Sequence, residues 1–357
     1  AWVYAALLAA VVAAWAGTPE RRRLLVAGLA VAPVLSFARS WLAWWGGQDP
    51  TRPYVGTFYW HNQAGIFLAL GVLTGVVVVL VGRRTQVLLG WLVIALCGAG
   101  VVVSTSRGAL AALALGLAVL LVLAALQPRR RLRSVGAVLA VPVVVAATAW
   151  LLTGPPFFAA RSALLSGTEA RSAHGETLSA NSAHRLDDWA HAWRVIQHWP
   201  LTGAGFHGFA AASKQVDPAG RGSLTPFAHN GFLQLLVDGG LVLAVPVLLL
   251  LAALAVSLVR RLPAAVASSD WAVLGGLAAL VALVVHSGMD FDWSYPALLG
   301  GLAVVSSVLW APAVAAPVSS RRWRLGLAGA YVVLVALAAV AAWGGILDLN
   351  AGLGGQS

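Results

Sequence analysis

The chain contains many apolar stretches of about 18 or more residues, and these stretches restrict what it can fold into. A helix needs about 20 consecutive apolar residues to cross the hydrocarbon core of a bilayer. The composition agrees, because 60% of the residues are hydrophobic and only 10% are charged, whereas soluble domains carry about 25% charged residues. The short alternating segments of a membrane β-barrel are missing from the sequence. The sequence therefore predicts an all-α, polytopic membrane helix bundle.

We expect about ten membrane-spanning helices, which form a single integral-membrane domain over residues 1–357. Arginine-rich connectors follow the first, third, fifth, seventh and ninth helices, so these connectors share one side of the membrane, the cytoplasmic side. The net charge of +11 is thus an orientation signal, and it does not indicate nucleic-acid binding. The expected spans lie near residues 1–16, 24–45, 60–81, 86–104, 107–126, 134–153, 230–258, 270–287, 297–316 and 325–347.

The chain begins at Ala1 inside an apolar run, without an initiator methionine. We therefore expect that further spans precede it, in an odd number if the natural N-terminus is cytoplasmic. The low lysine content beside abundant Arg, Ala, Gly and Val is typical of a bacterial gene of high GC content. The single cysteine, Cys97, lies within a span and can form no intrachain disulfide.

The longest connector, residues 154–228, is predicted to lie on the outer side of the membrane. Loops longer than about 15 residues are usually functional or disordered. Within it, "HRLDDWAHAWRVIQHWP" places Leu186, Trp189, Trp193 and Ile196 at helical spacing. Because tryptophan prefers the membrane interface, this pattern predicts an amphipathic helix on the outer leaflet. A purely structural interfacial helix is the alternative interpretation.

Arg107 lies in "STSRGALAAL", between two apolar spans. An arginine at the centre of a membrane helix costs about 2.5–3.5 kcal/mol, so its presence near the membrane suggests a function. The surrounding serines, threonine and glycine favour a tight turn that faces an outer cavity, where a guanidinium could bind two phosphate oxygens. The alternative is an arginine that snorkels from the end of a span.

Arg185 and Arg194 both belong to the predicted interfacial helix. Arg185 is followed by Asp187 and Asp188, and a local surface ion pair is the simplest interpretation of these three residues. The residues alone do not rank the two arginines as candidates for binding an anion.

His229 directly precedes Asn230, where the next apolar helix is expected to begin. Asparagine is a good N-cap, and the partly positive helix N-terminus disfavours protonation of a neighbouring imidazole. A neutral histidine suits a general base, although a structural histidine fits the same spacing. Asp238 lies inside the apolar span and needs a partner or a water-filled cavity.

These segments resemble, together and in order, the O-antigen ligase family and its Wzy-type polymerase relatives. The residues that carry the resemblance are "STSRGALAAL", "HRLDDWAHAW", "HWPLTGAGFHGF" and "FAHNGFLQLLVDGGLVLAVPVLLL". Two further segments look like parts of the same family: "GTFYWHNQAGIFLAL", which contains Asn62, and "HSGMDFDWSYPAL", which contains His286 and Asp290. The resemblance extends from residue 56 to about residue 300.

The resemblance implies a GT-C-like glycosyltransferase of the bacterial cytoplasmic (inner) membrane, with its active site facing the periplasm or exterior. Such an enzyme transfers a glycan from a polyprenyl-diphosphate donor, such as undecaprenyl diphosphate, to a hydroxyl of lipid A-core or another glycan. The resemblance implies inversion at the sugar and no metal or other cofactor. Arg107 and Arg185 match the family's diphosphate-binding arginines, and His229 matches its essential histidine. Supporting roles would fall to Asn62, Asn230, Asp238, His286 and Asp290.

Other functions remain open from the sequence. A Wzy-like polymerase would join polysaccharide repeat units, and some relatives glycosylate proteins. A transporter for a small anion such as inorganic carbon would also use charged residues in spans, but the sequence shows no inverted repeat. A purely structural membrane protein would need no polar residues on the outer side.

Overall fold

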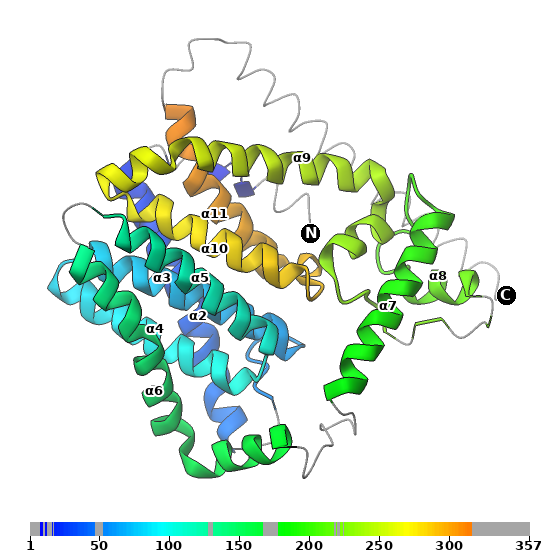
Figure 1. Cartoon of the computed structure of the whole chain (residues 1–357), viewed down its shortest axis with the longest axis horizontal. Coiled ribbons are helices and arrows are strands. Elements are labelled where there is room, and N and C mark those ends of the chain that lie inside the picture. Colours follow the sequence, from blue (N-terminus) through cyan, green and yellow to red (C-terminus); the bar gives the residue numbers. More distant parts are fainter. Residues whose placement is uncertain are drawn as a thin grey trace.

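The computed structural model of the chain describes residues 8, 9, 11, 12, 16, 18–46, 53–127, 131–166, 178–217, 219, 222, 223 and 225–315. Every regular element within these residues is a helix (Figure 1), which confirms the predicted all-α class. In chain order the elements are α2 (Pro19–Gly46), α3 (His61–Val81), α4 (Arg84–Ser104), α5 (Arg107–Ala125), α6 (Arg131–Ser166), α7 (Leu178–His198), α8 (Phe209–Val216), α9 (Gly231–Ser268), α10 (Trp271–Ser287), η1 (Asp292–Ser294) and α11 (Pro296–Ala315).

Six of the described helices are long and apolar enough to cross a membrane. Two shorter apolar helices, Trp271–Ser287 and Pro296–Ser307, correspond to the eighth and ninth predicted spans. The first predicted span lies largely outside the described residues, and the tenth lies wholly outside them. The six long segments are Leu24–Trp45, His61–Val81, Arg84–Ser104, Arg107–Ala125, Arg131–Ala160 and Gly231–Ser268.

Helix α3 is the centre of the bundle and is buried along most of its length. Helices α2, α4, α5 and α10 pack around it. In a bilayer, lipid is as apolar as the helices, so tight packing depends on small residues that let backbones approach. Helices α3 and α4 meet at Gly75 and Gly90, where a Cβ on either residue would lie 3.0 Å from the carbonyl oxygen of the other. This close approach therefore requires glycine on both helices.

The ends of the helices form two groups, as alternating spans require. At one end, Asn230 Nδ2, just before α9, donates to the carbonyl oxygen of Gly288, just after α10, at 3.0 Å. At the other end, Ser269 Oγ donates to Gln127 Oε1 at 2.7 Å and joins the α9–α10 and α5–α6 connections. Helices α3 and α5 begin at the first end, so the arginines that follow α3 and α5 belong to the second. Arg260 and Arg261, predicted in the connector after the seventh span, lie instead within α9, which continues to Ser268.

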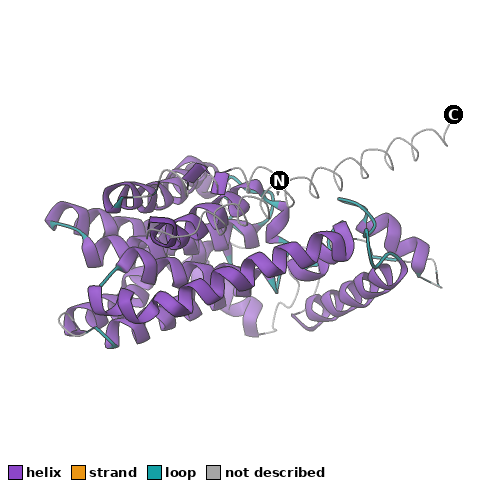
Figure 2. Cartoon of the chain, turned by 90° about the horizontal axis from the view of Figure 1, so that it is seen from above, coloured by secondary structure: helices purple, strands orange, loops and turns teal. Residues whose placement is uncertain are grey.

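Two long helices contain a glycine whose backbone leaves the helical conformation. Gly154 (φ 70°, ψ 177°) interrupts α6 where the predicted span of residues 134–153 ends. Gly240 (φ 56°, ψ −157°) interrupts α9 nine residues after its start. The longer part of α9 then runs along the outside of the bundle, and α7 and α8 lie beyond one end of the bundle (Figures 1 and 2).

The break in α9 is stabilised by the turn that follows α7. A helix that starts anew exposes amide groups that need partners in an apolar environment. The amides of Leu241 and Val242 donate to the carbonyl oxygens of residues 200 and 201 at 2.9 and 3.1 Å. A Cβ on Gly240 would lie 2.4 Å from the backbone of Leu201. These contacts attach α7 and α8 to α9.

Helix α7 confirms the helix predicted in the outer segment, and it also has a face that packs on protein. Ala192, Val195 and Ile196 are buried in a small core that α7 shares with α8 and the start of α9. Leu186 and Trp193 are 61% and 54% exposed. The exposed Leu186 and Trp193 remain available for the predicted contact with the outer leaflet, while the small Ala192 and Val195 allow α8 to pack closely.

We expect the substitution Gly240→Ala to destabilise the fold, because it adds a side chain at a positive φ and against the backbone of Leu201. The thermal unfolding midpoint of the detergent-purified protein should fall by roughly 5 °C or more. Gly136→Ala in α6 is the matched control, because nothing lies within 4 Å of a Cβ there and alanine favours a helix. Equal midpoints for the two variants would contradict this account of the break.

Candidate active site

Asp290 lies where three segments that are distant in sequence come together. It follows α10, and its side chain is 2% exposed. Asn62 Nδ2, from α3, donates to Asp290 Oδ2 at 2.6 Å. Arg185 Nη2, from α7, lies 3.6 Å from the same oxygen, and His229 Nδ1 lies 3.4 Å from Oδ1. One carboxylate therefore contacts three of the residues that the sequence singled out.

The charge of Asp290 is stabilised although the carboxylate is buried. Burial by itself would raise the pKa, but His229, together with the charges of His286 and Arg185, outweighs it and lowers the pKa from 3.8 to about 2. The amide of Phe291 also donates to Oδ1 at 2.9 Å, which favours the ionised form. The carboxylate is consequently negative at neutral pH.

The backbone of His229 is held in a left-handed conformation with φ 49°, which costs a residue with a side chain about 1–3 kcal/mol. The amide of Ala228 donates to Gln234 Oε1 at 2.8 Å, and Gln234 Nε2 donates to Asp238 Oδ1 at 2.7 Å. Asn230 Oδ1 accepts two backbone amides of α9, which confirms the predicted N-cap. The buried partner that Asp238 needed is thus Gln234, and Asp238 supports the backbone before His229 without contacting the imidazole.

The imidazole of His229 faces Asp290 with one nitrogen and leaves the other unoccupied. Its ring packs edge-on against Phe291, with ring centroids 5.1 Å apart, and its side chain is 22% exposed. Nδ1 is close to Asp290 but is not aligned for a hydrogen bond, so the attraction is mainly electrostatic. Among the described residues, no group hydrogen-bonds to Nε2. Two charges thus act on the imidazole, namely the partly positive N-terminus of α9 and the negative carboxylate of Asp290.

Arg185 does not form the local ion pair that its neighbours in the sequence suggested. Its guanidinium donates to the carbonyl oxygen of Met289 and contacts Asp290. Asp188 is instead buried and accepts a hydrogen bond from Ser223 Oγ at 2.6 Å. Because α7 packs against the loop after α10, the tertiary partner replaces the sequence neighbour.

The structure also distinguishes Arg185 from Arg194 as candidates for binding an anion, which the sequence alone did not. Arg194 Nη1 lies 3.4 Å from Asp217 Oδ1, just after α8, and its side chain is 46% exposed. Only Arg185 of the two contacts a neighbour of His229. Its side chain remains 30% exposed, so a ligand can still reach the guanidinium.

Arg107 is the first residue of α5, directly after the turn that the sequence predicted. Ser106 caps the helix, because its Oγ accepts from the amide of Ala109 at 3.1 Å. The start of α5 packs against the end of α10, since a Cβ on Gly108 would lie 3.3 Å from the ring of His286. Arg107 is exposed, and within the described part of the chain no carboxylate forms an ion pair with it. Its charge is therefore available at the same end of the bundle as Asp290.

His286 belongs to a second, fully buried network behind Asp290. Its Nδ1 lies 2.7 Å from Asp292 Oδ2, which also accepts from Ser287 Oγ at 3.1 Å. Gln63 Nε2 donates to Asp292 Oδ1 at 3.5 Å. The side chain of His286 is 1% exposed, so it supports the loop and cannot meet a substrate in this conformation.

Three polar residues of these networks were not among the predicted site residues, namely Gln63, Gln234 and Asp292. Gln63 and Gln234 lie in apolar runs, where a polar side chain is costly without a partner. Their place in apolar spans, like that of Asp238, is therefore the signal that could have identified them. Asp292 follows Asp290 by two residues in the same short loop, and nothing in the sequence distinguished their roles.

The site thus combines an ionised carboxylate, a histidine with one free nitrogen and two arginines at one end of the bundle. Such a set can accept a proton from a hydroxyl and can bind an anion. Within the described residues, no three His, Cys, Asp or Glu side chains are grouped as metal ligands would be.

Residues 92–248 match the sequence model of a family described as O-Antigen ligase. This match confirms the resemblance seen in the sequence. No sequence in a set of curated proteins matches the chain. The matched range contains Arg107, Arg185, His229, Asn230 and Asp238, whereas Asn62, His286 and Asp290 lie outside it.

We expect Asp290→Asn to lower stability by on the order of 2 kcal/mol at pH 7, because Arg185 and His229 lose their common carboxylate. The pKa of Asp290 lies below its ordinary value, so its contribution is complete above about pH 5 and is lost as the pH falls through 3.8 toward 2. Thermal unfolding between pH 2 and pH 7 measures both effects.

Asp187→Asn is the control for this experiment, because Asp187 is exposed on α7. If the wild type and the Asp290→Asn variant unfold at the same temperature at pH 7, the carboxylate does not hold the site together.

Proposed function

We propose, from the premise that this chain belongs to the O-antigen ligase family over residues 92–248, that it is a membrane glycosyltransferase. It transfers a glycan from a polyprenyl-diphosphate donor to a hydroxyl of an acceptor, either a lipid A-core sugar or another glycan. The observation that carries the proposal is the free Nε2 of His229, whose Nδ1 faces the buried carboxylate of Asp290.

His229 acts on the acceptor hydroxyl. A base is effective when a third group orients it, and Asp290 has that position relative to the imidazole. As the acceptor oxygen forms a bond to C1 of the donor sugar, its proton moves to Nε2 of His229. The strained left-handed backbone of His229 is consistent with a residue that is held for a function.

Arg107 and Arg185 act on the leaving group. The bond from C1 to the diphosphate oxygen breaks with its electron pair staying on the diphosphate, which needs charge neutralisation more than protonation. One guanidinium group can bind two phosphate oxygens at once, and it remains charged at all relevant pH values. Attack from the face opposite the diphosphate inverts the configuration at C1.

The orientation follows from the arginine-rich connectors at the other end of the bundle. If these connectors stay in the cytoplasm, the end with Asp290 and His229 faces the periplasm or exterior. The acceptor would then reach the site from outside the bacterial cytoplasmic membrane, and the polyprenyl chain of the donor would remain in the bilayer.

We expect His229→Ala to reduce transfer by about 10²–10⁴-fold, the usual contribution of a general base. Transfer is measured in proteoliposomes with a polyprenyl-diphosphate glycan and a panel of acceptors. His198→Ala is the matched control, because His198 is an exposed residue at the end of α7. Unchanged transfer in the His229→Ala variant would exclude the base. A lipid A-core acceptor indicates a ligase, and a repeat-unit acceptor indicates a polymerase.

Arg185→Gln and Arg194→Gln separate two arginines of the same helix. Arg185→Gln should lower kcat/KM for the donor about 10–100-fold, because a charged hydrogen bond contributes about 1.5–3 kcal/mol. Arg194→Gln should leave kcat/KM close to the wild-type value, since Arg194 pairs with Asp217. Equal losses in both variants would argue against a specific diphosphate contact at Arg185.

A further inference from the structure

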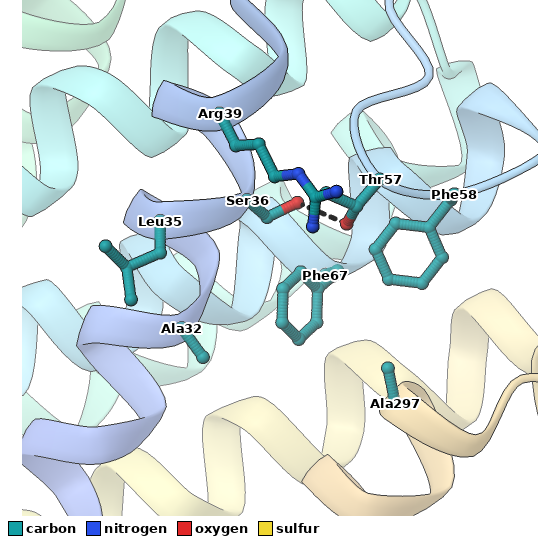
Figure 3. A pocket seen from close by; sticks show the side chains of 8 residues that line it. All are labelled: Ala32, Leu35, Ser36, Arg39, Thr57, Phe58, Phe67 and Ala297. Atoms are coloured by element: carbon teal, nitrogen blue, oxygen red, sulfur yellow. Dashed lines mark hydrogen bonds between the residues drawn. The ribbon is translucent and has the colours of Figure 1, made fainter.

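A cavity of about 310 Å³ opens between α2, α3 and α11, among residues that the proposed reaction does not use (Figure 3). Arg39 and Ser36 come from α2, and Thr57 and Phe58 come from the segment before α3. Phe67 of α3 and Ala297 of α11 also line the cavity.

Arg39 lies at the depth of lipid headgroups if α2 crosses the membrane. Trp41, Trp44 and Trp45 follow it and pack on one another, with ring centroids of Trp41 5.3 and 5.8 Å from those of Trp44 and Trp45. Tryptophan side chains gather at the membrane–water interface. Helix α2 ends at Gly46, seven residues after Arg39, which corresponds to about 10 Å along the helix.

The charge of Arg39 has no protein partner in the described part of the chain, where no carboxylate forms an ion pair with it. At headgroup depth, an arginine guanidinium pairs well with phosphate oxygens. Figure 3 shows the Arg39 guanidinium directed into the space between α2 and the segment of Thr57 and Phe58. An anion that pairs with this charge would therefore lie in the cavity.

The remaining lining suits a phosphate that is attached to an apolar chain. Ser36 Oγ and Thr57 Oγ1 lie 2.8 Å apart and offer hydroxyl groups beside the guanidinium. Phe58 and Phe67, whose ring centroids are 5.2 Å apart, form an apolar wall. Leu35, at the rim, is 63% exposed and would face acyl chains.

We infer that this cavity binds the phosphate group of a membrane lipid, with Arg39 as its cationic partner, one hydroxyl hydrogen of the Ser36–Thr57 pair as a further donor, and the lipid chain along Phe58 and Phe67. His229 does not line this cavity. Tyr295 and Phe291 lie between Phe58 and His229 in a chain of ring contacts. The inference does not rest on the proposed transfer reaction. The phosphate could belong to an acidic phospholipid or to a polyprenyl phosphate.

The test is native mass spectrometry of the full chain in detergent, titrated separately with phosphatidylglycerol, polyprenyl phosphate, diacylglycerol and inorganic phosphate. Arg39→Gln should bind the two phosphate lipids about tenfold more weakly than the wild type, because a charged hydrogen bond is lost. Ala297→Trp should weaken the same binding by filling the cavity from the exposed start of α11. Arg131→Gln is the matched control, because Arg131 is an exposed arginine at the other end of the bundle.

Tighter binding of one phosphate lipid than the other supports the site and identifies which lipid supplies the phosphate group. Three results would overturn it: equal affinity of the wild type and Arg39→Gln, equal affinity for diacylglycerol and phosphatidylglycerol, or comparable binding of inorganic phosphate without a lipid chain. The thermal unfolding midpoint of each variant shows whether it has folded. Because the readout is binding, a failure of the transfer assay leaves this result unaffected.

Discussion

The buried carboxylate of Asp290 is the point on which the arrangement of the site depends. A charge that is removed from water needs donors or opposite charges around it, and a lost partner leaves an expensive unpaired group. Asn62 supplies a donor from the most buried helix of the bundle, while Arg185 and His229 approach from the segment outside it. The need to stabilise one negative charge therefore connects the candidate base and a candidate diphosphate-binding residue to the rigid bundle.

The backbone of a membrane protein imposes a second constraint, because its amides have no water to bind inside lipid. Where Gly240 interrupts α9, the turn after α7 supplies the missing acceptors. The same nine-residue start of α9 carries Gln234 and Asp238, which hold the chain before His229. The break thus allows a short helix to present His229 while the longer part of α9 continues along the bundle.

The sequence predicted the helices well and the contacts between them poorly. Periodicity and length located the spans, and the cap at Asn230 was readable because a cap is a local interaction. The partner of Arg185 was not readable, since its sequence neighbour Asp188 binds Ser223 instead. The face of α7 that packs on α8 and α9 was not readable either, because burial depends on which helix packs against it.

By itself, the sequence determined the class of the protein, the positions of most spans and the separation of arginine-rich connectors from candidate site residues. These properties follow from local hydrophobicity and charge, which act on each segment independently. Only the tertiary structure decided that Asn62 and His229 meet at Asp290, and that Arg39 lines a cavity while Arg194 pairs with Asp217. Asn62 and Asp290 are 228 residues apart in the chain, and no local pattern specifies a contact over that distance. It is set by the packing of α3 and α10, and the burial of the carboxylate then makes the contact specific.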